Sequence, residues 1–393
     1  MGKKQRKLEV FDASARYYPS DALSLEQLGY WIAFSRVMGI GPVRFKMLLD
    51  FFQEDVALAW HARVSELSQA GLDRKTIESF FKQRSNIIPQ QELERLERLR
   101  IQVITWKDTA YPPLLRQIEY APPVIYVCGQ LNEQDYRYTL AIVGTRKMSN
   151  YGRQVTEHFT KELVQGKITI VSGLALGIDT VAHTTTLDTG GRTLAVLACG
   201  LDTIYPATNY NLAKRIVESG QGALLTAFPL GIRPESGNFP ARNHIISGLS
   251  LGVLVAEAPL KSGSLITAGS ALQQGREVFA APGGIFSSGG EGVNKLIRDG
   301  AHPVTNISDI LDNLNVHIVP AENKTRGRAL DLIESDGEKA LFTFLSYEPI
   351  HIDELIRTSE VAPEVVSATL TIMEIKGIVK HIGNMQYVRT MDL

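Results

Sequence analysis

The sequence predicts an α/β protein with an extended, doubly wound and mainly parallel sheet, flanked by a helical N-terminal domain and a C-terminal winged helix. Between residues 138 and 315, short runs that are apolar throughout alternate with amphipathic runs of helical length. Strands buried on both faces and joined by helices are typical of parallel sheets. Glycine-rich segments follow most of the apolar runs, which is the strand–turn–helix unit that faces backbone N–H groups toward an anion. We therefore expect a Rossmann-like domain over residues 101–315.

Length, charge and cysteine content indicate an ordinary protein of more than one domain. The chain has 393 residues, of which 44% are hydrophobic and 21% charged, and its formal net charge is -1. This balance gives no bulk attraction for nucleic acid. Cys128 and Cys199 lie within apolar runs, so we expect reduced core residues and neither a disulfide nor a metal site. Because no signal peptide or membrane-spanning stretch is apparent, the expected location is cytoplasmic.

The first hundred residues are predicted to form a basic tail and a helical domain. Residues 1–20 begin with four basic side chains and are expected to be disordered. In residues 21–100, apolar residues such as Leu28 and Trp31 recur at helical spacing. The Gly-Ile-Gly turn at 39–41 resembles that of a helix–hairpin–helix or SAM-like domain, whose glycine amides can face a DNA phosphate. The balanced charge of this region favours the simpler interpretation, a tight helical hairpin.

The central domain is expected to alternate strands and helices. Two strands come first, at 101–106 and 122–127, with a short helix entered through Tyr111-Pro-Pro between them. The later strands are expected at residues 140–143, 168–171, 193–198, 223–227, 252–256, 277–280 and 302–304. The helices that join or follow them are expected at residues 151–165, 178–188, 209–218, 241–248, 265–274, 292–298 and 307–314.

The last part of the chain is predicted to be a linker and a winged helix. Residues 316–330 are polar and unpatterned, which indicates a linker. Residues 331–393 give helices at 338–346, 351–358 and 362–376, then strands at 378–382 and 386–389 around a Gly-Asn turn that would be the wing. Residues 330–393 contain five Lys or Arg against eleven Asp or Glu. Because phosphate contacts supply most nonspecific affinity for DNA, this acidic module is expected to contact protein.

In a doubly wound sheet, ligands bind at the carboxyl ends of the strands, so residues that follow each predicted strand should share one rim. Glycine, serine, threonine and arginine are frequent there, and these residues suit a phosphate. Residues 110–315 carry 16 Lys or Arg and 16 Asp or Glu, so a polyanion site must be a local pocket. The candidate residues of this rim are Gly144, Thr145, Arg146, Ser172, Gly173, Phe239, Arg242, Asn243, His244 and Ser264.

The same rim offers little for catalysis. It lacks a P-loop, a Cys/His cluster spaced for zinc and a Ser-His-Asp arrangement, so no metal, cofactor or catalytic residue is predicted. Arg146, beside Gly-Thr, favours phosphate binding over a salt bridge, whereas Phe239 either stacks on a base or plugs the core. Asp179 is interpreted as a cap of N–H groups and His183 as a structural histidine. Glu257 is either a general base or an anchor for the loop backbone.

A string of motifs runs through roughly residues 105–315. In chain order these are Gly144-Thr-Arg146, Ser172-Gly-x-Ala-x-Gly-Ile-Asp179, Gly200-Leu-Asp-x-x-Tyr-Pro206, Phe239-Pro-x-Arg-Asn243, Ser262-Gly-Ser-Leu-Ile-Thr-Ala268, Gly275-Arg, Pro282-Gly and Gly292-x-Asn294. The string resembles that of the DNA processing protein A (DprA/Smf) family, in which a helical, SAM-like N-terminal region and a C-terminal winged helix are also known.

The resemblance implies a single-stranded DNA-binding protein and not an enzyme. Such a protein protects incoming DNA during natural transformation, loads the RecA recombinase onto it, and forms a homodimer through the Rossmann-like domain. Arginines and backbone amides would hold phosphates without reading sequence, and the aromatic ring would stack on any base. The positions that the resemblance assigns to DNA contact are Arg146, Ser172, Gly173, Phe239, Arg242 and Asn243.

Two departures from the family pattern remove positive charge, and two other functions stay open. Ala207 stands where the family often has a lysine, and His244 replaces an arginine, so we expect weaker or more pH-sensitive binding. One alternative is a Rossmann-like nucleotide phosphoribohydrolase, whose Pro-Gly-Gly motif begins like residues 282–284 and then departs from this sequence. The other alternative is a RecA-binding adaptor with little DNA affinity of its own.

Overall fold

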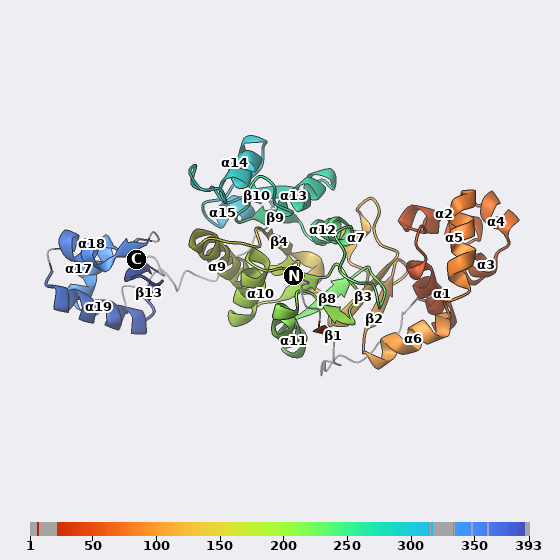
Figure 1. The fold of residues 1–393 in the computed structure, drawn as a ribbon, viewed down its shortest axis with the longest axis horizontal. Helices are drawn as coiled ribbons and strands as arrows, with labels where there is room; N and C mark the ends of the chain where they lie inside the picture. The colour runs from red at the N-terminus through yellow and green to blue at the C-terminus, as the bar shows by residue number, and fades with distance from the viewer. Residues whose placement is uncertain are drawn as a thin grey trace. The chain divides into compact units, whose positions relative to one another are not determined.

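The computed structural model describes residues 6–7, 22–314, 316, 333, 335–346, 349–359 and 361–389 (Figure 1). The chain divides into two compact units, Met1–Ile318 and Val319–Leu393. Within the expected basic tail, the pair Arg6–Lys7 forms β1, which is antiparallel to β7 (Thr203–Ile204). The rest of that tail, and the expected linker apart from Val316, lie outside the described residues.

The N-terminal helical region consists of short helices packed around aromatic residues. Ser24 caps the first helix, with its hydroxyl accepting a hydrogen bond from the N–H of Gln27 at 3.2 Å. Gly39 adopts a φ of 100° in the turn between the first two helices, a conformation that favours glycine. The helices are α1 (Leu25–Arg36), α2 (Pro42–Phe51), α3 (Val56–His61), α4 (Val64–Gln69), α5 (Arg74–Arg84) and α6 (Pro89–Arg98).

These helices and the edge of the sheet share one hydrophobic core. The Ser35 hydroxyl on α1 lies 2.6 Å from the Tyr126 hydroxyl on the sheet. Next to it, the Arg36 guanidinium donates to the carbonyl of Leu230 at 2.8 Å and pairs with Glu92 at 3.0 Å. The contacts of Ser35 with Tyr126 and of Arg36 with Leu230 cross residue 100, and the helical region and the sheet belong to the same compact unit.

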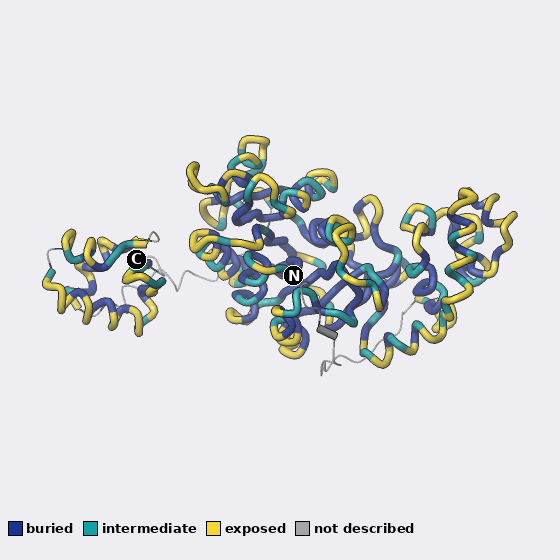
Figure 2. Tube along the Cα trace, in the orientation of Figure 1, coloured by how far each residue is buried: buried dark blue, intermediate teal, exposed yellow. Residues whose placement is uncertain are grey.

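A nine-stranded sheet forms the centre of the larger unit, and Figure 2 shows buried chain running through the middle of that unit. The strand order is β11-β10-β9-β4-β5-β6-β8-β3-β2, and pairing is parallel from β11 to β8 and antiparallel beyond. The predicted mainly parallel sheet is therefore confirmed. Its strands are β2 (Gln102–Thr105), β3 (Val124–Gly129), β4 (Thr139–Val143), β5 (Thr169–Ser172), β6 (Thr193–Val196), β8 (Gly222–Thr226), β9 (Gly252–Val255), β10 (Glu277–Ala280) and β11 (His302–Pro303).

Helices cover both faces of the sheet because strand side chains alternate between them. Along β4, Leu140 and Ile142 join the core under α9 and α10, whereas Ala141 and Val143 join the core under α12 and α13. The remaining helices of this unit are α7 (Pro113–Arg116), α8 (Gln134–Arg137), α9 (Asn150–Gln165), α10 (Ile178–Asp188), α11 (Tyr210–Glu218), α12 (Asn238–Gly248), α13 (Ser264–Gln273), α14 (Glu291–Arg298) and α15 (Ser308–Leu311), with a 3₁₀ turn at Ala207–Asn209.

Helix α8 was not predicted, and the bounds of several other helices, α12 and α15 among them, differ from the sequence-based expectation. Helix α12 begins at Asn238, three residues earlier than expected, so Phe239 lies in its first turn and not in a loop. Pro240 is tolerated there because N–H groups of a first turn have no partner within the helix. Helix α15 is shorter than the predicted 307–314.

The smaller unit confirms the predicted winged helix. It contains helices α17 (Asp336–Phe344), α18 (Ile352–Ser359) and α19 (Pro363–Ile375), and strands β12 (Ile350–His351), β13 (Val379–His381) and β14 (Gln386–Arg389) in the order β12-β14-β13. Gly383 and Asn384 have positive φ in the turn of the wing. Across both units, the described part of the chain contains no helix with the length and apolar character that a membrane crossing requires.

Candidate functional site

A cleft opens where the direction of the strand order reverses. From β4 the chain proceeds outward through β5 and β6 on one side, and through β9 and β10 on the other. Ligands bind at the carboxyl ends of strands at such a switch point. A hollow of about 440 Å³ lies there, between the turn after β4, the loop after β9 and the start of α12. We call it the cleft; its lining includes Gly144, Thr145, Arg146, Asp179, Phe239, Arg242, Asn243, Lys261, Ser262, Gly263, Ser264 and Thr267.

The turn after β4 is held in place by hydrogen bonds to Glu257, and its Arg146 side chain is exposed to solvent. The N–H of Thr145 donates to the backbone carbonyl of Glu257 at 2.8 Å, and the N–H of Ser149 donates to the carboxylate of the same glutamate at 2.8 Å. A Cβ atom on Gly144 would collide with that carbonyl, so glycine is required. Glu257 is buried and therefore anchors the loop backbone, one of the two roles expected for it.

Helical spacing on α12 brings four residues to the cleft. Phe239, Arg242, Asn243 and Ile246 stand at i, i+3, i+4 and i+7, which is one face of a helix. The Phe239 ring lies 5.2 Å from the guanidinium carbon of Arg146 and 5.7 Å from that of Arg242. Two cations thus flank one aromatic ring, an arrangement that favours electrostatic contact with the ring face.

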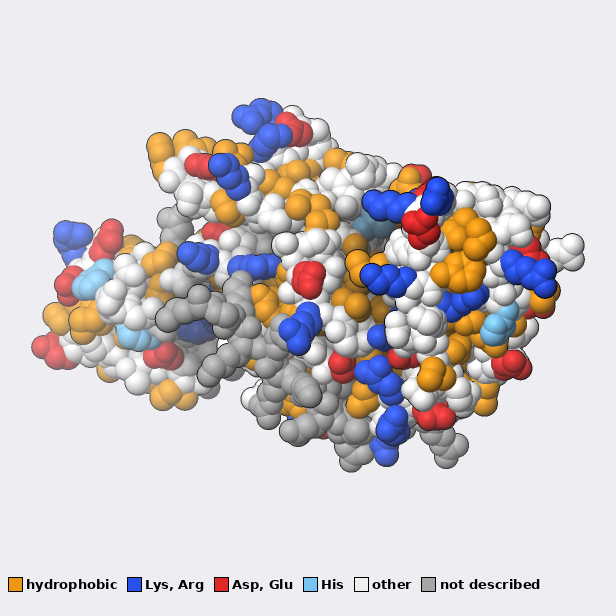
Figure 3. Space-filling view, turned by 45° about the vertical axis from the view of Figure 1, so that its right-hand side comes forward, with side chains coloured by type: hydrophobic (Ala, Val, Ile, Leu, Met, Phe, Trp, Pro, Cys, Tyr) orange, Lys and Arg blue, Asp and Glu red, His pale blue; other side chains and the backbone are white. Residues whose placement is uncertain are grey.

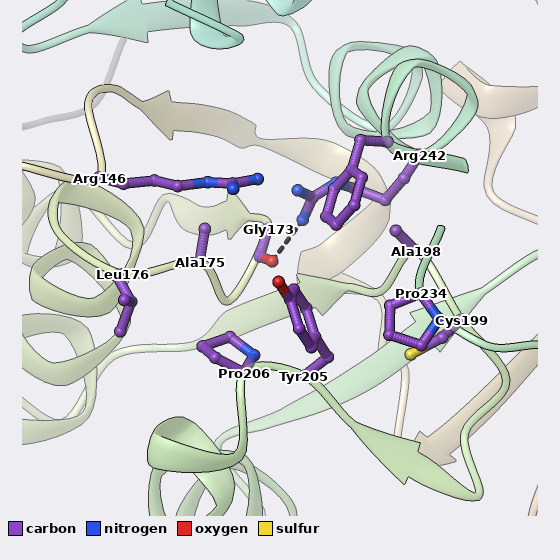
Figure 4. Close-up of a pocket in the computed structure, with 11 residues that line it drawn as sticks. Arg146, Gly173, Ala175, Leu176, Ala198, Cys199, Tyr205, Pro206, Pro234 and Arg242 are labelled. Atoms are coloured by element: carbon purple, nitrogen blue, oxygen red, sulfur yellow. Dashed lines mark hydrogen bonds between the residues drawn. The ribbon is translucent and has the colours of Figure 1, made fainter. Parts of the chain in front are cut away.

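A smaller pocket adjoins the cleft and shares Arg146, Phe239 and Arg242 with it. In Figure 4, Arg146 and Arg242 enter this pocket from opposite sides and their guanidinium groups point toward one another, with Tyr205 and Pro206 below them. Burial lowers the pKa of Arg242, and the charge of Arg146 lowers it further. The two like charges repel, so an anion placed between them would be stabilised by both.

Arg242 is built into the floor of the site by hydrogen bonds. Its guanidinium donates to the carbonyl of Gly173 (Figure 4). It also donates to the carbonyl of Val196 at 3.0 Å and, through Nε, to the Asn243 amide oxygen at 3.1 Å. A Cβ atom on Gly173 would overlap the guanidinium, so glycine permits this close approach. The Gly173 position predicted from sequence therefore supports Arg242 through its backbone.

Asp179 supplies the buried negative charge opposite Arg242. Its carboxylate accepts hydrogen bonds from the N–H groups of Gly173 at 3.1 Å and Ala175 at 3.3 Å, so it caps N–H groups as expected. Burial raises the pKa of Asp179, while Arg242 and the two N–H groups oppose that rise. The aspartate thus fixes the turn after β5 and balances part of the charge of Arg242.

The loop after β9 adds hydroxyl groups and a lysine. The Asn243 amide donates to the carbonyl of Gly263 at 3.2 Å, and the hydroxyls of Ser262 and Ser264 lie 2.7 Å apart. Lys261 is exposed and lines the cleft. Sequence reasoning missed this lysine, although its place directly before Ser-Gly-Ser at the end of a predicted strand was a usable signal.

Of the predicted residues, Gly173 lines only the smaller pocket, and two others line neither the pocket nor the cleft. Ser172 is fully buried, and its hydroxyl donates to the carbonyl of Ile142 at 2.6 Å. His244 lies two residues after Arg242, about 200° around the helix, and so faces away from the cleft. Its ring nitrogens contact the carbonyl of Glu119 at 2.8 Å and the side chain of Gln274 at 2.9 Å. His244, which was expected to stand in place of a DNA-binding arginine, therefore does not lie in this cleft.

His183 is a structural histidine, as expected. It is fully buried on α10, where Nε2 accepts from the N–H of Leu174 at 3.3 Å and Nδ1 lies 2.7 Å from the hydroxyl of Thr193. Burial, followed by the charge of Arg242, lowers its pKa to about 3. The imidazole is therefore neutral in the folded protein at neutral pH.

The buried histidine should make stability depend on pH. In the unfolded chain His183 has an ordinary pKa of about 6.5, so between pH 6.5 and pH 3 the unfolded chain binds one more proton than the folded chain. The free energy of unfolding therefore falls by about 1.4 kcal/mol for each pH unit of acidification in this range. Between about pH 7 and about pH 5, wild type should lose about 2 kcal/mol more unfolding free energy than His183→Gln. Urea unfolding of both proteins at each pH measures the difference, and parallel pH profiles would contradict it.

The described residues contain no group of three or more His, Cys, Asp or Glu side chains arranged to hold a metal ion. Cys128 and Cys199 are both buried, and burial raises the pKa of each thiol to about 12.

Figure 3 shows Lys and Arg interspersed with Asp and Glu over one face of the molecule, without a continuous basic surface. Recognition of an anion therefore depends on local geometry such as that of the cleft.

Comparison with known proteins identifies the family. The sequence profile of the DNA recombination-mediator protein A family matches residues 102–315, and that of the DprA winged helix domain matches residues 327–384. Protein Smf of Synechocystis sp. is 37% identical over 393 aligned residues, which cover 92% of this chain and 98% of the relative. DNA processing protein DprA of Bacillus subtilis is 42% identical over 214 residues, which cover 54% and 71% of the two chains.

A solved structure of the same family has a similar fold. The crystal structure of DNA processing protein A from Streptococcus pneumoniae superposes with a TM-score of 0.64 at 33% identity, and the match covers 72% of this chain and 97% of that one. The family match spans the strands and loops that build the cleft, from β2 to the end of the sheet. This chain therefore belongs to the DNA recombination-mediator protein A (DprA/Smf) family.

Proposed function

We propose that this protein binds single-stranded DNA in the cleft, without reading its sequence. The observation that carries the proposal is the pair of facing guanidinium groups, Arg146 and Arg242, flanking the ring of Phe239. A phosphate between the guanidinium groups relieves their repulsion, and a base stacks on the ring. Lys261 and the hydroxyl groups of the loop after β9 extend the phosphate-binding surface. Because Ala207 stands where the family often has a lysine, less positive charge was expected here, and Lys261 supplies a positive charge to the cleft.

A role in recombination follows from the family. We propose that the bound strand is protected and passed to the RecA recombinase, that the protein acts in the cytoplasm, and that it forms a homodimer through the Rossmann-like domain. The description of the family as recombination mediators supports the transfer of the strand to a recombinase. The phosphoribohydrolase alternative has less support. Among the described residues that line the cleft, the one carboxylate is that of Asp179, and it accepts hydrogen bonds from two backbone N–H groups.

Arg146→Ala tests the proposal directly. Wild type should bind a fluorescent single-stranded oligonucleotide in preference to its duplex, and the affinity should fall with salt. Loss of one phosphate contact should weaken binding and reduce the slope of log affinity against log salt by about 0.7. The measurement is fluorescence anisotropy over a series of salt concentrations.

Arg137→Ala is the matched control. Arg137 is also exposed but precedes β4, whereas Arg146 follows it, so the two arginines stand at opposite ends of one strand. Arg137→Ala should leave both the affinity and the slope unchanged. Equal effects of the two substitutions would indicate a diffuse electrostatic attraction and place the site outside the cleft.

A further inference from the structure

A second aromatic side chain stands free on the edge of the sheet that carries the cleft. Phe286 is 98% exposed, more than any other large hydrophobic side chain among the described residues, and its neighbour Ile285 is 80% exposed. Both lie in loop 281–290, which follows β10 and leads into α14. At this exposure both faces of the Phe286 ring are open to solvent.

The loop that carries Phe286 is held in place by hydrogen bonds. Its backbone closes on itself, with the N–H of Ser287 donating to the carbonyl of Gly284 at 3.0 Å. The side chain of Asn294 on α14 accepts from the N–H of Gly283 at 3.1 Å and donates to the carbonyl of the same glycine at 2.9 Å. The ring is therefore presented by a fixed backbone.

The same anchor holds this loop and the turn of Arg146. Glu257 accepts from the N–H groups of Thr145 and Ser149, as described above, and its carboxylate occupies the space that a Cβ atom on Gly289 would fill. The next residue, Ala258, donates its N–H to the carbonyl of Gly289 at 2.9 Å. Strand β9 lies between β4 and β10, so the two segments are about 10 Å apart along the rim.

We propose that Phe286 is a second stacking platform for the DNA, so that the strand continues from the cleft past Glu257 to loop 281–290; this inference rests on the function proposed above. Proteins that bind single strands irrespective of sequence combine a cationic groove with aromatic rings on which successive bases stack, and Phe286 would add such a ring beyond the cleft. A protein partner fits less well, because a stable interface covers about 800 Å² per partner and two exposed side chains on one loop supply only a small part of that.

The test compares Phe286→Ala with wild type on oligothymidylates of about 4 to 16 nucleotides, the span of known single-strand sites. The longest should bind Phe286→Ala about 5- to 150-fold more weakly than wild type, which is the effect of one lost stacked base. The shortest, which fill only the cleft, should bind both proteins alike. Phe286→Tyr should retain the affinity, and Ile285→Ala, the control on the same loop, should lose less.

Each outcome decides between the possibilities. If wild type binds and Phe286→Ala binds equally at every length, the platform does not exist. If the loss is the same at every length, Phe286 acts on the cleft itself and the extended path is wrong. If sedimentation shows that Phe286→Ala changes the oligomeric state and leaves the affinity unchanged, the loop is a protein interface. Failure of wild type to bind any oligonucleotide would overturn the proposed function as well.

Discussion

Phe239→Ala is expected to weaken the binding of single-stranded DNA by about 5- to 150-fold, because stacking of one base on an aromatic ring contributes about 1–3 kcal/mol. The ring is half-buried at the start of α12 and lines both the cleft and the smaller pocket. Arg146 and Arg242 flank it at 5.2 and 5.7 Å, and the Tyr205 ring lies 6.0 Å away. These contacts orient the ring before a base arrives.

Salt dependence separates this substitution from the loss of a charge. Phe239→Ala removes no cation, so the slope of log affinity against log salt should equal that of wild type, whereas Arg146→Ala reduces it. Phe239→Tyr keeps an aromatic face and should bind almost as wild type does. Phe239→Leu keeps apolar volume without a π face and should resemble alanine. Unchanged affinity in Phe239→Ala would mean that the ring only fills space in the core.

The architecture was readable from the sequence because the strands are apolar throughout. A strand buried on both faces leaves an unbroken run of apolar residues, as in 140–143, and such runs located the parallel strands of the sheet. The rule that ligands bind at the carboxyl ends then brought Arg146 and Ser264 together from separate parts of the chain. Strand order was not readable, because pairing depends on contacts between distant segments.

Side-chain direction limited the prediction of the site. His244 was grouped with Arg242 and Asn243 because they are adjacent in sequence, but a helix turns about 100° per residue and carries His244 to another face. Ser172 ends β5, yet its hydroxyl is fully buried against the neighbouring strand. Lys261 was not predicted, because the prediction relied on the hydroxyl groups of Ser262-Gly-Ser264 that follow it.

Arg242→Met is expected to lower the unfolding free energy by about 3–5 kcal/mol, the usual cost of leaving a buried charge without its compensating charge. Arg242 is 5% exposed and Asp179 is 6% exposed, so the change leaves a buried carboxylate without its cation. It also removes the donors to the carbonyls of Gly173 and Val196. Arg146→Met, the same substitution at an exposed cation of the same pocket, should cost less than about 0.5 kcal/mol. Equilibrium denaturation in urea measures both.

The pH dependence of this loss identifies its cause. With Arg242 gone, the largest of the effects that oppose burial is lost, so the folded pKa of Asp179 rises further above the unfolded value of about 3.9 and the folded chain takes up the proton first. The deficit of Arg242→Met should therefore shrink as the pH falls toward the folded pKa. In Asp179→Asn/Arg242→Met, the carboxylate is absent and the deficit should no longer vary with pH in this way. A deficit that is equally large at every pH in the single variant would instead assign the loss to the two carbonyls and to packing, and not to the buried charge.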